Sequence, residues 1–192
     1  MIKTERLVMS PLRLQDAYDM SGWGSHSDPR LFEYNLADLT RKDYIFWYAT
    51  KRRTRHKNYY SIRDKEGRLL GYLGIKDINY RDKSAYLGVV LNPDNLSKGI
   101  GTEAIRAFLA YMMETYDLLR VFLLVNNFNR RALACYKKCG FKEVDHFEGV
   151  FENQRLDKDD KDFDKYFTCH KGVIYSKNTI MEVSREEVGN EV

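Results

Sequence analysis

The stretch SAYLGVVLNPDNLSKGIGT, residues 84–102, decides the fold that this sequence predicts. Its first part, 84–91, is a short, β-branched apolar run closed by Asn92-Pro93, which is typical of a strand buried on both faces. After it, Ile105, Phe108, Leu109 and Met112 recur at steps of three and four residues, the period of an amphipathic helix. The glycines of the intervening loop therefore lie where a helix begins.

The loop Lys98-Gly99-Ile100-Gly101-Thr102 has the chemistry of an anion site. The first turn of a helix presents N–H groups without intrahelical partners, and its dipole favours anions. The two glycines carry no Cβ, so a phosphate could approach the main chain, while Lys98 adds a positive charge and Thr102 a hydroxyl. The loop lacks the spacing of a P-loop or a dinucleotide motif. In isolation, an ordinary strand-to-helix connection explains it better than a pyrophosphate cradle.

Length and composition predict one folded domain, because 192 residues with 43% hydrophobic and 14% aromatic content can build a full core. A net charge of +4 suits an anionic small ligand, and no basic stripe is dense enough to indicate a nucleic-acid face. The basic run 51–57 is the exception. We interpret it as a solvated helix end, with an RNA-facing patch as the weaker alternative.

No apolar run is long enough to span a membrane, and the start MIKTERLVMS is not a signal peptide. Three cysteines fit a reducing compartment, so we expect a cytoplasmic protein. Cys135 and Cys139 lie four apart on a predicted helix and could share a face. Without a nearby zinc-spaced pair they are interpreted as packing residues, and no metal is expected.

Elsewhere the periodicity predicts a mixed α/β order. Asn129 is expected to cap a helix that Gly140 ends, and Thr40 with Asp43 to cap another. The charged segment 153–165 is expected to be a solvated loop, 166–176 and 179–183 a strand hairpin, and the chain from Glu186 onward is expected to fray. The remaining predicted strands are 6–12, 58–63, 69–78, 84–91, 120–125 and 141–144; the remaining predicted helices are 14–20 and 29–35.

With these segments placed, the pattern resembles the GNAT family of N-acetyltransferases. The resemblance runs from about residue 85 to 144 and includes the strand with Gly88, the loop 98–104, Arg120-Val121, the turn Asn129-Arg130-Arg131-Ala132 and the run 136–141. The start Thr4-Glu5-Arg6-Leu7 with Pro11-Leu12 is similar to the branch that includes ribosomal-protein N-terminal acetyltransferases.

The resemblance implies an acetyl-CoA cleft between the strands 84–91 and 120–125, which splay apart. The main chain of Val89, Val90 and Leu91 would pair with the pantetheine arm, and Asn129 would contact that arm or its entrance. Tyr136 would protonate the departing thiolate, and a strand amide such as Val90 N–H would hold the thioester carbonyl. The pyrophosphate would be held by the amides of Lys98, Gly99, Ile100, Gly101 and Thr102.

Two positions depart from the family pattern, because Leu96 replaces a polar loop residue and Tyr86 replaces a glutamate that often acts as a base. An α-amine of pKa ~8 is more often neutral than a lysine amine of pKa ~10.4, so the missing carboxylate favours a low-pKa acceptor. Asp77, His146 and Glu148 remain alternative bases acting through water. The aromatic residues Trp23, Phe32, Tyr34, Trp47 and those near 147–151 are candidates for the acceptor pocket, without an assigned role.

The sequence thus predicts a single α/β (α+β) domain over residues 1–192, with a mixed, mostly antiparallel sheet that is splayed at the acetyl-CoA cleft and flanked by helices. Residues 1–57 would form the acceptor side, 58–146 the acetyl-CoA-binding core and 147–192 a closing loop and hairpin. The expected function is acetyl transfer from acetyl-CoA to a primary amine, a protein N-terminus or a small molecule, by direct attack. Alternatives are an acyl-CoA-binding regulatory module without turnover, an antibiotic or polyamine acetyltransferase, and an RNA-associated protein. A homodimer is left open.

Overall fold

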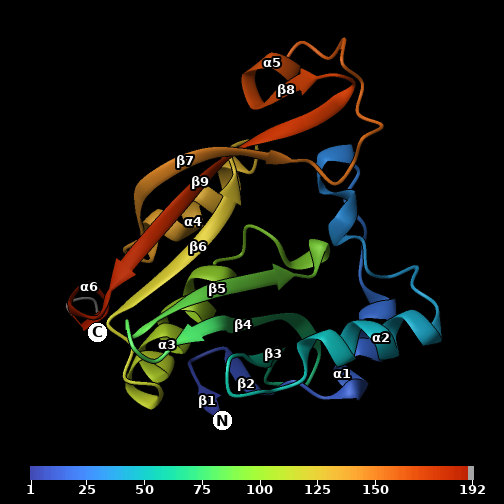
Figure 1. Cartoon of the computed structure of the whole chain (residues 1–192). Coiled ribbons are helices and arrows are strands. Elements are labelled where there is room, and N and C mark those ends of the chain that lie inside the picture. Colours follow the sequence, from blue (N-terminus) through green and yellow to red (C-terminus); the bar gives the residue numbers. More distant parts are fainter. Residues whose placement is uncertain (190–192) are drawn as a thin grey trace.

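The computed structural model describes residues 1–189 and builds them around one nine-stranded sheet (Figure 1). In sheet order the strands are β1 (Ile2–Lys3), β2 (Leu7–Pro11), β3 (Asn58–Asp64), β4 (Leu69–Asn79), β5 (Ser84–Leu91), β6 (Arg120–Asn126), β9 (Val173–Ser184) and β7 (Lys142–Val150), with β8 (Phe167–His170) paired to β9 beside this path. Every pairing is antiparallel except that of β5 with β6. The mixed, mostly antiparallel sheet expected from the sequence is confirmed.

Helices cover both faces of the sheet. The longest, α3 (Ile100–Thr115), lies with α4 (Arg130–Lys138) on one face, where Phe108 is fully buried in the main core. On the other face, α1 (Leu14–Asp19) and α2 (Arg41–Lys51) pack beside β3 and β4 around Tyr72. The remaining helices are short: η1 (Met20–Gly22), η2 (Pro29–Tyr34), η3 (Pro93–Asn95), α5 (Phe163–Tyr166) and α6 (Arg185–Gly189).

Helix α2 begins where the sequence predicts, because Thr40 and Asp43 form a reciprocal capping box. Its C-terminal residue Lys51 opens the basic run, which then leaves the helix and turns back through a bridge between Thr54 and Lys57. Within residues 1–189, no helix is both long and apolar enough to cross a membrane.

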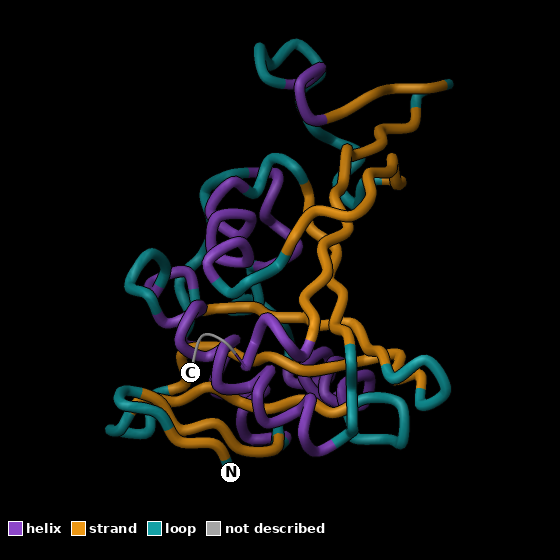
Figure 2. Tube along the Cα trace, turned by 90° about the vertical axis from the view of Figure 1, so that its left-hand side faces the viewer, coloured by secondary structure: helices purple, strands orange, loops and turns teal. Residues whose placement is uncertain are grey.

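The parallel strands β5 and β6 separate after a short contact. Their register pairs Ser84 with Arg120, Ala85 with Val121 and Tyr86 with Phe122, and it ends there. Beyond that point β5 continues beside β4 and β6 continues beside β9, so the C-terminal halves of the two strands diverge (Figure 1 and Figure 2). The expected splay is therefore present, and it opens a wedge at the centre of the sheet.

The predicted strand break near residues 177–178 is wrong. β9 is one strand of twelve residues that inserts between β6 and β7, and Asn178 pairs with both Asn126 and Phe147. Asn178 and Ser176 resemble turn residues in sequence, but they are buried and bond each other, with Asn178 Nδ2 donating to the Ser176 carbonyl at 2.8 Å. The hairpin turns instead at Gly172, whose φ of +82° suits glycine.

Two further boundaries differ from the sequence prediction. β7 continues to Val150, well past the predicted end at 144, because β9 offers it a partner along its whole length. Residues 185–189 form α6 rather than a frayed end, while residues 190–192 lie outside the described part of the chain.

The charged tail 153–165 is tied down by an aromatic cluster. This cluster joins α5, β8 and β9 to the segment before α4, and Phe128 packs against Phe151 and Phe167 with ring centroids 5.8 and 5.5 Å apart. Arg30 of η2 places its guanidinium 5.6 Å from the centroid of the Phe128 ring. The buried members of this cluster are Phe128, Phe151, Phe163, Tyr166, Phe167 and Ile174. The tail and η2 are therefore held together beside β8 and β9.

Candidate active site

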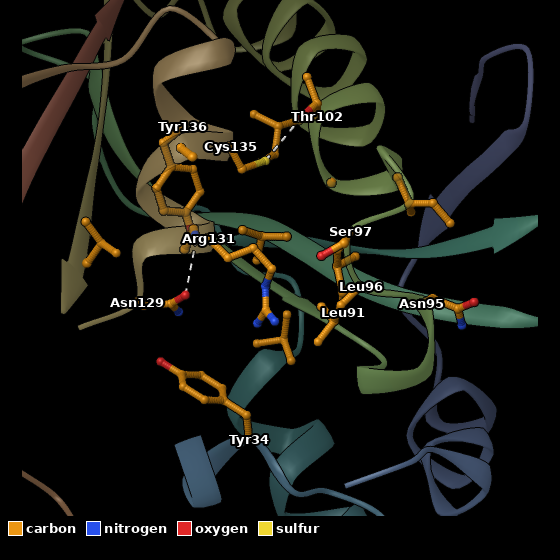
Figure 3. Close-up of a pocket in the computed structure, with 18 of the residues that line it drawn as sticks. Tyr34, Leu91, Asn95, Leu96, Ser97, Thr102, Asn129, Arg131, Cys135 and Tyr136 are labelled. Carbon is orange, nitrogen blue, oxygen red and sulfur yellow. Dashed lines mark hydrogen bonds between the residues drawn. The ribbon is translucent and has the colours of Figure 1, made fainter. Parts of the chain in front are cut away.

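A cavity of about 380 Å³ occupies the wedge between β5 and β6 (Figure 3). Its walls come from the C-terminal half of β5, the loop before α3 and the start of α3, the end of β6, α4, and the segment 26–34. The predicted site residues that line it are Val89, Val90, Leu91, Gly99, Ile100, Gly101, Thr102, Asn129 and Tyr136. The fold therefore brings nine of the ten predicted positions around one space.

Lys98 is the predicted residue that does not line the cavity. Its ammonium is turned back onto its own loop, donating to the Asp94 carbonyl at 2.7 Å and to Asn95 Oδ1 at 3.2 Å. Its carbonyl accepts a hydrogen bond of 3.0 Å from the Arg6 guanidinium. Lys98 thus shapes the loop, and the proposed direct contact of its side chain with a phosphate does not fit this geometry.

The two glycines of the loop are needed for different structural reasons. Gly99 is the N-cap of α3 with φ +79° and ψ −4°, a left-handed conformation that costs other residues about 1–2 kcal/mol. At Gly101 a Cβ would lie 3.3 Å from both Cys135 Sγ and Leu91 Cδ1, so glycine allows α3, α4 and β5 to meet closely. The amides of Ile100, Gly101 and Thr102 in the first turn of α3 have no intrahelical partners, and these residues line the cavity. This is a cradle that fits a pyrophosphate.

The N-terminal segment braces this cradle from outside. Glu103 in the first turn of α3 accepts hydrogen bonds from Thr4 Oγ1 at 2.5 Å, from the Arg6 amide at 3.0 Å and from the Arg6 guanidinium at 2.6 Å. Burial acts to raise the pKa of Glu103, but these bonds outweigh it and hold that pKa below its usual range. The run Thr4-Glu5-Arg6-Leu7 therefore serves to fix the loop at the start of α3.

The main chain of β5 presents alternate residues to the wedge. Asn92 N donates to the Leu70 carbonyl at 2.8 Å, and the same register continues through Tyr72 opposite Val90. Because bonded pairs alternate in an antiparallel ladder, Val90 exchanges its bonds with Tyr72, while Val89 and Leu91 point their N–H and C=O groups toward the opening. The Val90 N–H is therefore directed toward β4, which does not fit the expected contact with a carbonyl in the cleft, whereas the main-chain groups of Val89 and Leu91 face the opening.

Tyr136 and Asn129 stand on opposite ends of the α4 wall. The Tyr136 ring packs on Phe141 with centroids 6.0 Å apart, and burial, followed by the charges of Cys135 and Tyr34, raises its phenol pKa well above the usual range. A phenol of raised pKa stays protonated at neutral pH and can donate a proton. Asn129 caps α4 as expected, with its Oδ1 accepting from Ala132 N at 3.2 Å.

The cavity also contains residues that the sequence interpretation did not assign. Arg131 projects into the space between α4 and the loop (Figure 3). Cys135, interpreted as a packing residue, lines the cavity with its Sγ 3.4 Å from Thr102 Oγ1, and a hydrogen bond with Cys139 is the largest cause that lowers its thiol pKa to about 6. His26 and Tyr34 complete the wall from the N-terminal segment. Two of these residues have a signal in the sequence: Arg131 belongs to the turn Asn129-Arg130-Arg131, and Tyr34 is an acceptor-pocket candidate without an assigned role.

The charges around the cavity are positive. Arg131 and Lys138 are among the lining residues, and within residues 1–189 no aspartate or glutamate is. Such a wall suits the phosphates of a nucleotide-bearing carrier. In the described part of the chain no group of three metal-type ligands was found.

The alternative bases lie away from this wall. Asp77 lines a second cavity of about 350 Å³ on the other face of the sheet, together with Tyr86 and Leu124, and Leu124 also lines the first cavity. His146 pairs with Thr179 Oγ1 at 3.0 Å, and Glu148 accepts from Thr168 at 3.0 Å. Of the aromatic candidates, Tyr34 lines the first cavity, whereas Trp23 and Trp47 pack against Tyr72.

A wedge between splayed strands, with a glycine-bearing helix start at one side and the half-buried Tyr136 at the other, is typical of an acyl-CoA cleft. The acetyltransferase (GNAT) domain matches residues 6–142 of the chain. The protein therefore belongs to the GNAT acetyltransferase family.

Relatives and solved structures agree with this family. The chain is 30% identical over 95 residues to the spermidine N(1)-acetyltransferase of Vibrio cholerae serotype O1, covering 49% of this chain and 55% of that protein. It is 26% identical over 76 residues to the enzyme of the same name from Escherichia coli K12, covering 40% and 41%. The chain thus spans about half the length of the curated relatives it matches.

The fold extends further than the sequence similarity. The crystal structure of spermidine N-acetyltransferase from Vibrio cholerae in complex with CoA and spermine superposes with a TM-score of 0.73 at 19% identity, covering 97% of this chain and 100% of that one. A dodecameric structure of the same enzyme gives 0.69 at 18% identity, covering 98% and 99%. At this identity the likeness shows the shared fold.

Proposed function

We propose that the protein is an N-acetyltransferase that moves an acetyl group from acetyl-CoA to a primary amine by direct attack. The observation that carries this proposal is the single cavity that joins the first-turn amides of α3 to the half-buried Tyr136. An anion site and a proton donor at opposite sides of one wedge are what an acetyl-CoA reaction needs, because the carrier is anchored by phosphate and leaves as a thiolate.

The chain's residues divide the binding of the carrier between them. The amides of Ile100, Gly101 and Thr102 would hold the pyrophosphate at the positive end of α3. Arg131 supplies a full charge within the same cavity. The free main-chain groups of Val89 and Leu91 would pair with the pantetheine amides like an added strand. Asn129, fixed as the cap of α4, lines the route between them.

The chemistry then requires a neutral amine, a C–N bond and a protonated thiol. The amine nitrogen attacks the thioester carbonyl carbon, the C–S bond breaks, and the electron pair leaves on sulfur. Tyr136 donates its phenol proton to that sulfur, because its raised pKa keeps the proton in place until a stronger base appears beside it. None of the described groups forms a covalent acyl intermediate in this scheme.

For the acceptor we favour a small polyamine. The relatives that match the chain are named as spermidine acetyltransferases. The positive cavity itself does not recognise a polycation. Burial raises the pKa of Tyr34 at the cavity wall, and the nearby charges of Glu152 and Glu33 raise it further. These carboxylates could hold the distal ammonium groups. A peptide α-amine is the second acceptor class, because the start of the chain is similar to N-terminal acetyltransferases.

The test is the release of CoA thiol from acetyl-CoA with spermidine, spermine, a monoamine of similar pKa and a peptide with a free N-terminus. We expect turnover with the two polyamines and kcat/KM at least tenfold lower with the monoamine. Preference for the peptide would replace the polyamine assignment while keeping the reaction class. Calorimetric binding of acetyl-CoA without turnover on any amine would instead indicate a regulatory acyl-CoA-binding module.

Two further expectations accompany the proposal, one on cellular location and one on self-association. The three cysteines of the sequence are few, which supports the proposed reducing, cytoplasmic location. Self-association is proposed on the basis of the dodecameric neighbour and is read directly from the mass in light scattering.

A further inference from the structure

The main cavity lacks an obvious group to take a proton from the attacking amine. Its titratable lining residues are two cations, Arg131 and Lys138, two tyrosines, the thiol of Cys135, and His26. The tyrosines have raised pKa values and do not accept protons near pH 7. Cys135 sits beside Thr102 at the start of α3, which places its thiol at the phosphate end of the wedge. His26 is therefore the lining residue whose type suits a general base.

The position of His26 is fixed by a side-chain clamp. Its backbone N–H donates to Asn35 Oδ1 at 2.6 Å, and its carbonyl accepts from Asn35 Nδ2 at 3.1 Å. The imidazole then packs edge-on against Tyr34, with ring centroids 6.5 Å apart and an interplanar angle of 72°. The main chain of His26 is thus held on both sides by Asn35, and the ring lies against Tyr34.

Tyr34 connects His26 to the reacting end of the wedge. Its hydroxyl is close enough to Tyr136 for their charges to interact, which is one of the causes that raise the Tyr136 pKa. The three rings therefore follow one another along the cavity wall, from the proton donor Tyr136 through Tyr34 to His26. An amine that reaches the thioester from the side of the segment 26–34 would meet the imidazole, which lines the same cavity.

The surroundings keep the imidazole neutral. Partial burial is the main cause that lowers the pKa of His26 below 6.5, and the charge of Arg131 lowers it further, while Asp28 opposes them. Among the described residues, the charged and titratable groups that face the ring are Asp28 on its own loop, Tyr34 on η2 and Arg131 on α4. At pH 7 the ring can therefore accept a proton.

We propose that His26 is the general base of the transfer reaction, reached by the amine directly or through one water. This step rests on the proposed function. The bound ammonium gives one proton to an imidazole nitrogen, and the neutral amine attacks the thioester carbon. As the C–S bond breaks, Tyr136 protonates the sulfur, and the second proton from nitrogen restores the phenol. His26 then releases its proton to solvent, so the net products are the acetylated amine, CoA thiol and one proton.

The test is the pH profile of kcat at saturating spermidine for the wild type, His26→Gln and His26→Asn. Wild-type kcat should fall with unit slope below the His26 pKa, which lies under 6.5, because the protonated ring cannot act as a base. Both variants should lose roughly 10²-fold in kcat at pH 7 and should lack this acidic limb. Acceptors with an amine pKa below the assay pH should lose much less, because they arrive already neutral.

His56→Gln is the matched control. His56 also packs on a tyrosine, with its ring 6.2 Å from Tyr80, but it lies outside the cavity, so its pH profile should equal that of the wild type. Calorimetry of acetyl-CoA binding by each variant shows that the cleft is intact. Variants that bind acetyl-CoA and keep the wild-type acidic limb would overturn the role of His26. A wild-type protein that turns over no amine would instead overturn the proposed function.

Discussion

The two sides of the cavity are built in different ways. On the carrier side, one contiguous stretch, 89–102, supplies strand main chain, a left-handed N-cap at Gly99 and the first turn of α3. On the acceptor side, the wall is the segment 26–34, which contacts the aromatic cluster, far away in sequence, through Arg30 and Leu31. A phosphate is held by backbone whose shape a few residues set, whereas the acceptor meets side chains whose positions depend on packing between distant elements.

This difference predicts separable effects. Changes on the carrier side should alter acetyl-CoA affinity through the backbone and should act whatever the amine. Changes on the acceptor side should alter KM for the amine and leave acetyl-CoA binding alone. Tyr136 lies between the two sides, so its loss should affect neither binding step and should appear in kcat.

The largest expected effect is that of Tyr136→Phe. The ring keeps its packing against Phe141, so the fold and the Kd for acetyl-CoA should stay unchanged. Loss of the proton donor should lower kcat by about 10²–10⁴-fold, the usual range for a positioned general acid. Calorimetry and thiol-release kinetics on the same preparation measure both quantities. Wild-type kcat in this variant would remove Tyr136 from the mechanism.

Gly99→Ala tests the backbone of the carrier side. A residue with a Cβ at φ +79° costs about 1–2 kcal/mol, so a loop that shifts to relieve this strain should bind acetyl-CoA roughly tenfold more weakly. Gly67→Ala is the matched control, because Gly67 has φ +85° in a turn remote from the cavity. Both variants should lose similar thermal stability, and only Gly99→Ala should lose affinity. Equal affinities would show that the loop backbone is not the phosphate site.

The sequence predicted the carrier side well because its signals are local. The glycine loop, the strand before it, the helix after it and the Asn129 cap each follow from a short pattern, and the structure has all of them. The sequence predicts that the charge of Lys98 favours an anion at the loop, but its ammonium is turned onto the Asp94 carbonyl, and the direction of a lysine side chain depends on nearby carbonyls that no spacing reveals. The facing of Val90 was missed because it depends on the register with β4.

The acceptor side was not predictable from local patterns. His26 sits in a stretch rich in glycine and serine that indicates only a loop, and its place at the cavity depends on its bonds with Asn35. Tyr34 is among the aromatic candidates, but no local pattern separates it from Trp23 and Trp47, which pack against Tyr72 instead. The strand break assigned at Asn178 failed for a related reason. Polar residues there satisfy one another inside the sheet, and this arrangement requires β7 on the other side of β9.

The smallest expected effect tests how the acceptor side is held. Arg30 joins η2 to the aromatic cluster, with its Nη2 2.8 Å from Asp28 Oδ2 and its guanidinium 5.8 Å from the centroid of the Tyr166 ring. A half-exposed ion pair and a cation–π contact together contribute about 1 kcal/mol. Arg30→Gln should therefore raise KM for the amine about threefold to fivefold, because η2 carries Tyr34 at the cavity wall, while the Kd for acetyl-CoA stays unchanged.

Arg41→Gln controls for the general loss of such a contact, because Arg41 lies over the Tyr18 ring at 5.4 Å and takes no part in the cavity wall. The two variants should have similar thermal stability, and only Arg30→Gln should change the KM for the amine. If both variants kept the wild-type KM, η2 would hold its place through Leu31 and the main chain alone. If Arg30→Gln weakened acetyl-CoA binding instead, the two sides of the cavity would be mechanically coupled, and the division between a backbone-built and a side-chain-built wall would not hold.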